Sequence, residues 1–175
     1  RVETLDTGTP YRVILDYSHS PDALENILKT AREFTRGRVI VVFGCGGDRD
    51  QGKRPIMGEI GGKLADFCIL TSDNPRTEDP LKILSAIERG IRPTGKPYLV
   101  IENRREAILK ALTIGKDGDT IILAGKGHET YQEIMGVKRP FDEKAVVAEL
   151  LQADAETFIA RLTDLTGGRD TAEIL

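Results

Sequence analysis

The segment TSDNPR, residues 71–76, places an aspartate, an asparagine and an arginine around a proline that stiffens the backbone. Three other segments also combine charge with glycine or other polar residues: DYSH (16–19), GCGGDRD (44–50) and GKGHE (125–129). Their charged side chains include both signs: Arg49, Arg76 and Lys126 are available for anions, and Asp73 and Glu129 for a cation. Guanidinium groups bind carboxylates in a bidentate manner, and carboxylates suit an ammonium group. These segments therefore predict a zwitterionic ligand, most simply an amino acid with an additional carboxylate.

Simpler interpretations of the same residues remain open. Arg76 could pair with Asp73 or Glu78 in a solvated loop, where ion pairs are common and contribute little. His19 and His128 follow expected strands, and histidines in such places are more often hydrogen-bonding loop residues than catalysts. Neither histidine has a partner at metal-ligand spacing, so the sequence predicts no metal site.

The glycine-rich segment 44–50 invites comparison with phosphate-binding loops. A dinucleotide fingerprint would need a third glycine where Arg49 stands, and Pro55 starts the next helix too late to receive a pyrophosphate. Gly-Lys pairs occur elsewhere in the chain, but neither serine nor threonine follows any of them. The sequence thus contains no standard phosphate loop for ATP.

Apolar runs predict the elements that carry these segments. Continuous β-branched runs are typical of strands that are covered on both faces. We expect strands at 12–16, 38–43, 67–70, 98–101 and 120–124, and helices that begin at Ser20-Pro21, Lys53, Asp79-Pro80, Asn103 and Asp142. This alternation predicts an α/β fold, a Rossmann-like open sheet that is mostly parallel, with helices on both faces. Ligands of such sheets bind at the carboxyl ends of the strands, where the four charged segments should lie.

Two further features concern the edges of the fold. Residues 131–134 and 137–141 predict an antiparallel edge hairpin that turns near Gly136. The first helix should turn an apolar face inward that consists of Leu24, Ile27, Leu28, Ala31 and Phe34. We expect residues 1–151 to form the domain and 152–175 an appended helix, with Phe158, Ile159, Leu162 and Leu165 on one face, and a polar tail.

Composition limits the class of protein. The net charge of -3 and the pI of about 5.5 provide no cationic surface for nucleic acid or for an anionic membrane. No signal peptide and no apolar run of membrane-spanning length is visible, which favours a cytoplasmic protein. Cys45 and Cys68 lack redox or zinc spacing, and we expect both to be structural.

Taken together, the charged segments resemble a known family. DYSHSPD (16–22), VVFGCGGDRDQGKRP (41–55), TSDNPR (71–76) and AGKGHETYQ (124–132) follow the order and spacing of the carboxyl-terminal domain of a Mur ligase. The resemblance covers residues 1–151. It is specific to the MurE type, which adds the third residue of the peptidoglycan precursor, and Asp-Asn-Pro-Arg marks the members that accept meso-diaminopimelate.

The resemblance implies roles for the matching residues. Those implied to bind meso-diaminopimelate are Arg49, Asp73, Asn74, Pro75, Arg76, Gly125 and Glu129. The side chains at 73, 74 and 76 would bind its distal, D-configured end, Gly125 and Glu129 its ammonium, and Arg49 the other carboxylate. Those implied to contact a nucleotide are Arg1, Asp16 and His19. No catalytic residue is implied in this chain.

The resemblance also implies a larger enzyme. ATP and magnesium would bind mainly to a central domain, and the UDP-N-acetylmuramoyl dipeptide to the other domains, so the isolated chain is expected to be inactive. The reaction would serve peptidoglycan biosynthesis, and through it cell wall biogenesis, cell shape and cell division. Two alternatives remain: a free-standing, regulatory amino-acid-binding module, or a related ligase that adds lysine or glutamate.

Overall fold

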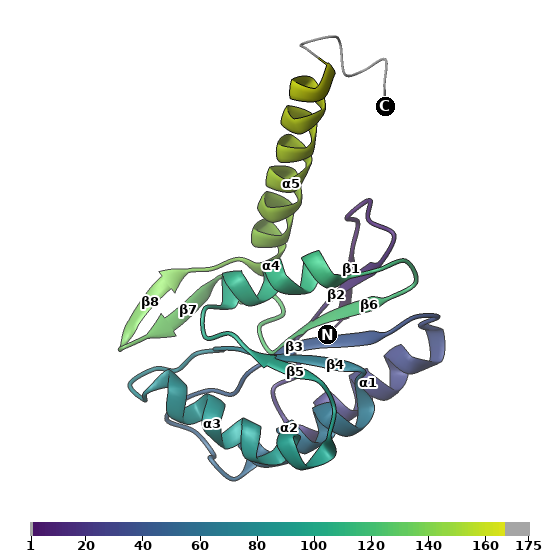
Figure 1. Cartoon of the computed structure of the whole chain (residues 1–175). Coiled ribbons are helices and arrows are strands. Elements are labelled where there is room, and N and C mark those ends of the chain that lie inside the picture. Colours follow the sequence, from purple (N-terminus) through teal and green to yellow (C-terminus); the bar gives the residue numbers. More distant parts are fainter. Residues whose placement is uncertain (1, 167–175) are drawn as a thin grey trace.

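A six-stranded sheet forms the centre of the computed structural model, which describes residues 2–166 apart from some side chains near the end of that range (Figure 1). The strand order is β1-β2-β6-β3-β4-β5. The strands are β1 (Val2–Leu5), β2 (Arg12–Asp16), β3 (Val39–Phe43), β4 (Phe67–Leu70), β5 (Tyr98–Val100) and β6 (Thr120–Ala124). Each neighbouring pair is parallel except β1 and β2. The predicted, mostly parallel α/β sheet is therefore confirmed.

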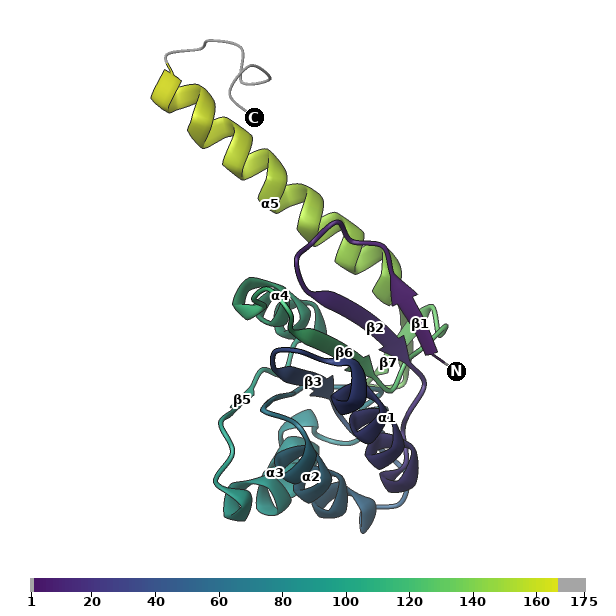
Figure 2. The same ribbon diagram turned by 90° about the vertical axis from the view of Figure 1, so that its right-hand side faces the viewer.

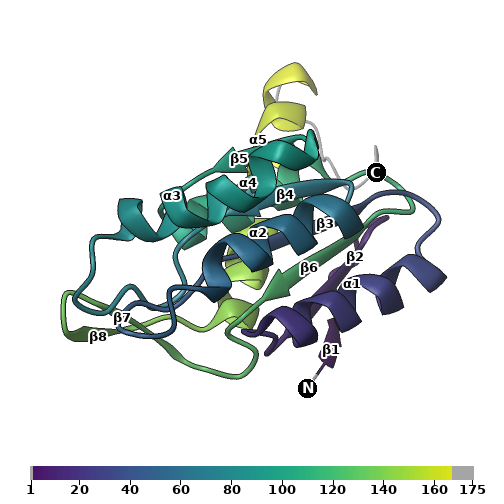
Figure 3. The ribbon, with the colours of Figure 1, turned by 90° about the horizontal axis from the view of Figure 1, so that it is seen from below.

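Helices cover both faces of this sheet (Figures 1 and 3). They are α1 (Pro21–Phe34), α2 (Lys53–Leu64), α3 (Pro80–Ile91), α4 (Arg104–Ile114) and α5 (Glu143–Thr166), with a short 3₁₀ turn at Arg92–Thr94. Helices α1, α2 and α3 pack on the face that carries Val39, Val41 and Phe43. Helix α4 and the first turns of α5 pack on the opposite face, with Ile40 and Val42. Because β3 is buried on both sides, all five of its residues are apolar.

Side-chain caps fix the starts of three helices, and with them the ends of the preceding loops. Ser20 accepts a hydrogen bond from the N–H of Ala23, Asp79 from Leu81 and Asn103 from Glu106. The predicted starts of α1, α3 and α4 are thus confirmed. Helix α2 has no such cap and contains glycines at 58, 61 and 62, which weakens its sequence signal. A Cβ on Gly58 would lie 2.1 Å from the carbonyl oxygen of Ile87, so glycine lets α2 approach α3 closely.

The structure differs from the sequence expectations at the periphery. Strand β1 was not predicted, because its four residues show little hydrophobic pattern and pair only with β2. Phe34 is 41% exposed rather than inward, and the guanidinium of Arg12 lies 4.6 Å from its ring centre. The hairpin forms as β7 (Tyr131–Ile134) and β8 (Val137–Pro140), but as a separate two-stranded sheet. It is joined to the body by a bridge between Ile134 and Arg76.

Helix α5 begins after Asp142, as predicted, and continues without a break to Thr166. Its first turns contribute Val146, Val147 and Leu150 to the core, whereas the later turns project from the body (Figure 2). Residues 152–166 therefore extend α5 rather than form a second helix, and Arg1 and residues 167–175 lie outside the described residues. The division of the chain after residue 151 stays a prediction. No helix in the described part of the chain is long and apolar enough to cross a membrane.

Candidate functional site

The four charged segments meet at the edge of the sheet where the parallel strands end. The N–H of Gly125, after β6, donates to the carbonyl of Asp16, at the end of β2, at 2.9 Å. The N–H of Gly47, after β3, donates to the carbonyl of Asn74, after β4, at 2.8 Å. The β7–β8 hairpin lies at the same end of the molecule (Figure 3). We call this edge the rim, defined by residues 16–19, 44–50, 71–78 and 125–134.

The loops after β3 and β4 are locked together by an ion pair at the rim. Arg54, which is buried, lies 2.6 Å from Glu78 and also donates to the carbonyl of Gly46 at 3.1 Å. Glu78 accepts a further hydrogen bond from the N–H of Asp48 at 2.6 Å. The hydrogen bond from Arg54 holds the pKa of Glu78 below its usual range. Glu78 is therefore an ionised structural group with its own partner.

Arg76 has no strong carboxylate partner at the rim. Its Nη1 donates to the carbonyl of Gly47 at 2.8 Å, and its Nε is 3.8 Å from Glu133. Glu78 pairs with Arg54 instead, and Asp73 faces Lys126. The simpler interpretation, in which Arg76 pairs with Asp73 or Glu78, is wrong. The backbone of Arg76 has a φ of 53°, and its N–H donates to the carbonyl of Glu133, so the hairpin supports this strained position.

Asp73 and Asn74 are buried residues of the rim, and both lie beside Lys126. The Nζ of Lys126 lies 2.9 Å from Asn74 Oδ1 and 3.5 Å from Asp73 Oδ1. The sequence suggested that Lys126 is available to an anion, but the structure contradicts this because the side chain is completely buried. Asp73 Oδ1 is buried beside Lys126 and has no hydrogen-bond partner among the described residues.

Arg49 and Glu129 lie on the outer part of the rim. A Cβ on Gly46 would lie 2.7 Å from Arg76 Nη1 and 3.8 Å from Arg49 Cγ, so the two arginines flank Gly46. Arg49 is exposed and donates to the carbonyl of Asp48 at 3.3 Å. Glu129 is half-buried, and its Oε2 lies 3.5 Å from Asn74 Nδ2. The arginines thus lie on either side of Gly46, whereas Glu129 contacts Asn74.

The residues expected near a nucleotide lie on the loop after β2. Asp16 is buried, and its Oδ2 accepts hydrogen bonds from the N–H of Ser18 at 3.0 Å and from the Ser18 hydroxyl. Burial raises the pKa of Asp16 above its usual value. His19 is exposed, and Lys53 at the start of α2 donates to its carbonyl at 2.8 Å. Arg1 lies outside the described residues.

Sequence reasoning missed a buried ion pair that supports the rim from below. Arg104 and Glu143 are completely buried and lie 2.5 Å apart. The guanidinium of Arg104 also donates to the carbonyl of Ser72 at 3.2 Å and to that of Ala124 at 3.0 Å. It therefore connects the ends of β4 and β6 with the start of α5. Arg104 is the first residue of α4, and nothing in the neighbouring sequence indicates that it is buried. Its partner Glu143 comes beside it only in the folded chain.

We expect Gly47→Ala to damage the rim specifically. The added Cβ would lie 1.9 Å from the carbonyl oxygen of Pro75, so the loops after β3 and β4 would have to separate. We expect a loss of about 1–3 kcal/mol in the free energy of unfolding, measured with urea. Gly52→Ala is the control, because its Cβ would meet only the tip of Asp50 at 3.2 Å. Equal stability of the two variants would contradict the close approach.

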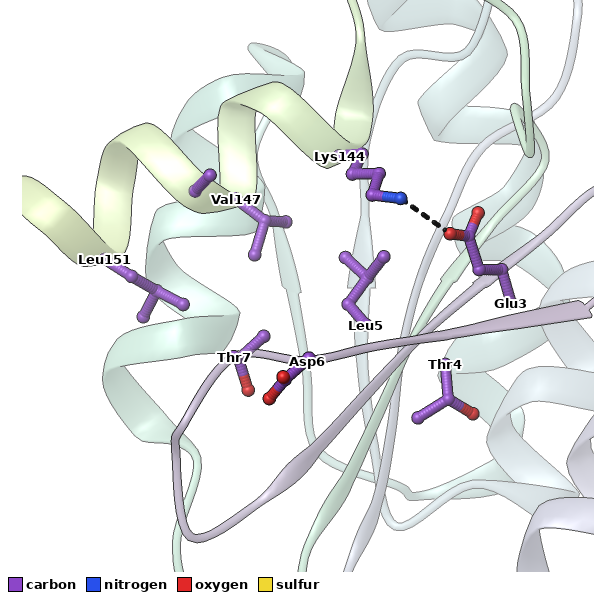
Figure 4. Close-up of a pocket in the computed structure, with 9 residues that line it drawn as sticks. Glu3, Thr4, Leu5, Asp6, Thr7, Lys144, Val147 and Leu151 are labelled. Carbon is purple, nitrogen blue, oxygen red and sulfur yellow. Dashed lines mark hydrogen bonds and ion pairs between the residues drawn. The ribbon is translucent and has the colours of Figure 1, made fainter.

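One hollow adjoins these loops, and a second lies apart from them. One, of about 540 Å³, lies behind the loop after β4 and is lined by Pro75, Gln132 and Arg104, among others. The other, of about 440 Å³, lies between β1 and α5, and an ion pair of 2.9 Å between Glu3 and Lys144 lies at its wall (Figure 4). The second hollow contains none of the predicted site residues. The first is the one that adjoins the rim.

The described residues do not fit magnesium or the phosphates of ATP. Among residues 2–166 no group of three or more His, Cys, Asp or Glu side chains is placed to hold a metal ion. Burial raises the pKa of both cysteine thiols to about 12, so neither is a thiolate at neutral pH. The loop after β3 is occupied by contacts to Arg54, Glu78 and Asn74. Its Gly-Lys pair at 52–53 precedes arginine rather than serine or threonine.

Comparison with known proteins gives consistent similarities. Residues 1–127 match the family described as "Mur ligase, glutamate ligase domain". A UDP-N-acetylmuramoyl-L-alanyl-D-glutamate--2,6-diaminopimelate ligase from Caldanaerobacter subterraneus subsp. tengcongensis is 56% identical over 151 residues, which is 86% of this chain and 31% of that protein. A solved structure of a ligase of that description is 42% identical with a TM-score of 0.84, over 89% of this chain and 32% of the other. The chain thus spans about a third of the relatives it matches.

More distant structures share the fold. A bifunctional folylpolyglutamate synthase/dihydrofolate synthase from Yersinia pestis, complexed with AMPPNP and a Mn ion, has a TM-score of 0.55 at 16% identity. That match covers 86% of this chain and 30% of the other. At this level of identity the likeness concerns the fold alone.

Proposed function

This chain belongs to the Mur ligase family, and from that premise we propose that it is the amino-acid-binding domain of an ATP-dependent ligase that adds meso-diaminopimelate to UDP-N-acetylmuramoyl-L-alanyl-D-glutamate. Residues 1–151 would form this domain of a cytoplasmic enzyme of peptidoglycan biosynthesis. The relatives described as diaminopimelate ligases support the choice of substrate.

One observation carries the choice of ligand. Arg76 and Arg49 flank Gly46, while the neighbouring acidic groups Glu78 and Asp73 are engaged with Arg54 and Lys126. A rim with two neighbouring arginines, of which Arg76 has only Glu133 at 3.8 Å as an ion-pair partner, suits a ligand that brings its own carboxylates. Meso-diaminopimelate has two carboxylates and two ammonium groups, and Glu129 would bind one of the ammonium groups.

The contribution of this domain to the reaction is orientation. An amine nucleophile attacks an activated carboxylate most rapidly when both are held in the reacting geometry, which can account for several kcal/mol of the barrier. The rim would fix both ends of the diamino acid and so direct one amine away from the sheet. We assign no general base to this chain. We place the activation step, which would use ATP and magnesium, in other parts of the enzyme.

A chimera tests this function. The chain would replace the matching third of the Caldanaerobacter relative, and ATP-dependent ligation of meso-diaminopimelate would be measured. We expect the chimera to be active, whereas the purified 175-residue chain and the relative without its last third should both be inactive. Ligation by the chain alone, or a folded chimera without ligation, would contradict the proposal.

A titration separates the remaining alternatives. In calorimetric titrations of the chain or the chimera, we expect a heat of binding with meso-diaminopimelate and a much smaller one with lysine or glutamate. Equal heats for the three amino acids would contradict the specificity. Binding of meso-diaminopimelate by the chain together with an inactive chimera would favour a regulatory module instead.

A further inference from the structure

Lys126 is a buried charged side chain of the rim that the proposed ligand contacts do not use. It lies between Gly125 and Gly127. Their φ values of 116° and 52° are positive, and such backbone conformations favour glycine. Its ammonium is completely buried and donates to Asn74 Oδ1 at 2.9 Å and to the carbonyl of Tyr131 at 3.0 Å. Asp73 Oδ1 lies 3.5 Å away on its third side. The ammonium thus donates two hydrogen bonds, and the Asp73 carboxyl is an ion-pair contact without hydrogen-bond geometry.

These contacts determine which way the amide of Asn74 points. Its Oδ1 accepts from Lys126 and also from the N–H of Glu133 at 3.0 Å. Both neighbours are donors, so the carbonyl end must face them and the NH₂ end must face the rim, toward Glu129. Rotation of the amide by 180° would bring its NH₂ against two donors. Asn74 can therefore offer the ligand only a hydrogen-bond donor.

We propose that Lys126 is a positioning residue that determines specificity: by holding the Asn74 carbonyl, it makes Asn74 a donor to the distal carboxylate of the diamino acid. The inference rests on the proposed function, since it concerns the same ligand. An apolar side chain could fill the same space, and buried ion pairs are often replaced by apolar residues without loss of stability. An apolar residue could not hold the amide in one orientation.

The second consequence concerns Asp73. Its Oδ1 lies 3.5 Å from the Lys126 ammonium and receives no hydrogen bond among the described residues. Lys126 therefore contacts both Asp73 and Asn74, two adjacent residues that are assigned to one end of the ligand.

The test is Lys126→Met in the active chimera, with kcat and KM measured for meso-diaminopimelate, lysine and ATP. We expect KM for meso-diaminopimelate to rise about tenfold or more, as for loss of a charge-assisted hydrogen bond. The kcat, KM for ATP and kcat/KM for lysine should stay within about twofold, because lysine has no distal carboxylate. Lys144→Met is the control, since Lys144 pairs with Glu3 at the surface, outside the rim.

Asn74→Asp provides a second variant that keeps Lys126 paired. It replaces the donor with an acceptor of the same size, so it should raise KM for meso-diaminopimelate at least as much as Lys126→Met does. Unchanged KM in either variant, or an equal loss for lysine and meso-diaminopimelate, would overturn the inference. If Lys126→Met does not fold, Asn74→Asp decides. An inactive wild-type chimera would instead count against the proposed function.

Discussion

Replacing Arg76 with alanine is expected to remove most of the discrimination between meso-diaminopimelate and lysine. A site built around a polar partner can reject an analogue without that partner by roughly 10⁴, because the site's own group is then left desolvated and unpaired. Arg76 fits this role, since its side chain is 22% exposed and its nearest carboxylate is 3.8 Å away. Its planar fork can form two charge-assisted hydrogen bonds, each worth about 1.5–3 kcal/mol.

The measurement is the ratio of kcat/KM for the two amino acids in the chimera. We expect Arg76→Ala to lower this ratio by about 10² or more, through weaker use of meso-diaminopimelate and better use of lysine. Arg76→Lys retains the charge without the fork, and its ratio should be intermediate. A ratio equal to that of the wild type would show that Arg76 does not bind the distal carboxylate.

The second large effect is expected for the buried pair of Arg104 and Glu143. Burial disfavours the charged guanidinium, but the adjacent carboxylate of Glu143 holds the pKa of Arg104 above its usual value. Glu143→Gln removes that charge and leaves Arg104 buried without a counter-charge. We expect a loss of about 3–5 kcal/mol in the free energy of unfolding, read from urea denaturation as a lower midpoint with an unchanged slope.

The same two helices contain a matched control. Arg105 of α4 and Glu149 of α5 form an ion pair of 2.8 Å, but both side chains are about half exposed. Glu149→Gln should therefore cost no more than about 1 kcal/mol. Similar losses in the two variants would mean that the buried pair does not hold α5 and the ends of β4 and β6 together. Because Arg104 also binds the carbonyls of Ser72 and Ala124, Glu143→Gln should in addition weaken the binding of meso-diaminopimelate.

The local sequence was sufficient to predict the elements that depend only on neighbouring residues. The start of α1 could be predicted because Ser20 and Pro21 act within one turn, and the start of α4 because Asn103 caps the N–H of Glu106. Strand β1 could not be predicted, since its pairing with β2 depends on residues about ten positions away. The exposure of Phe34 also escaped prediction, because helical spacing does not say where the sheet beneath the helix ends.

For the site, the residue types and the side of the sheet where they meet could be predicted from the sequence alone. Parallel strands end on one side, so segments that follow four such strands must gather there. Which charges are paired could be seen only in the folded chain: Glu78 pairs with Arg54, Lys126 is buried against Asp73 and Asn74, and Arg76 has no strong carboxylate partner. The pairing of charges depends on distances of a few ångströms between separate loops, and those distances exist only after the sheet has brought the loops together.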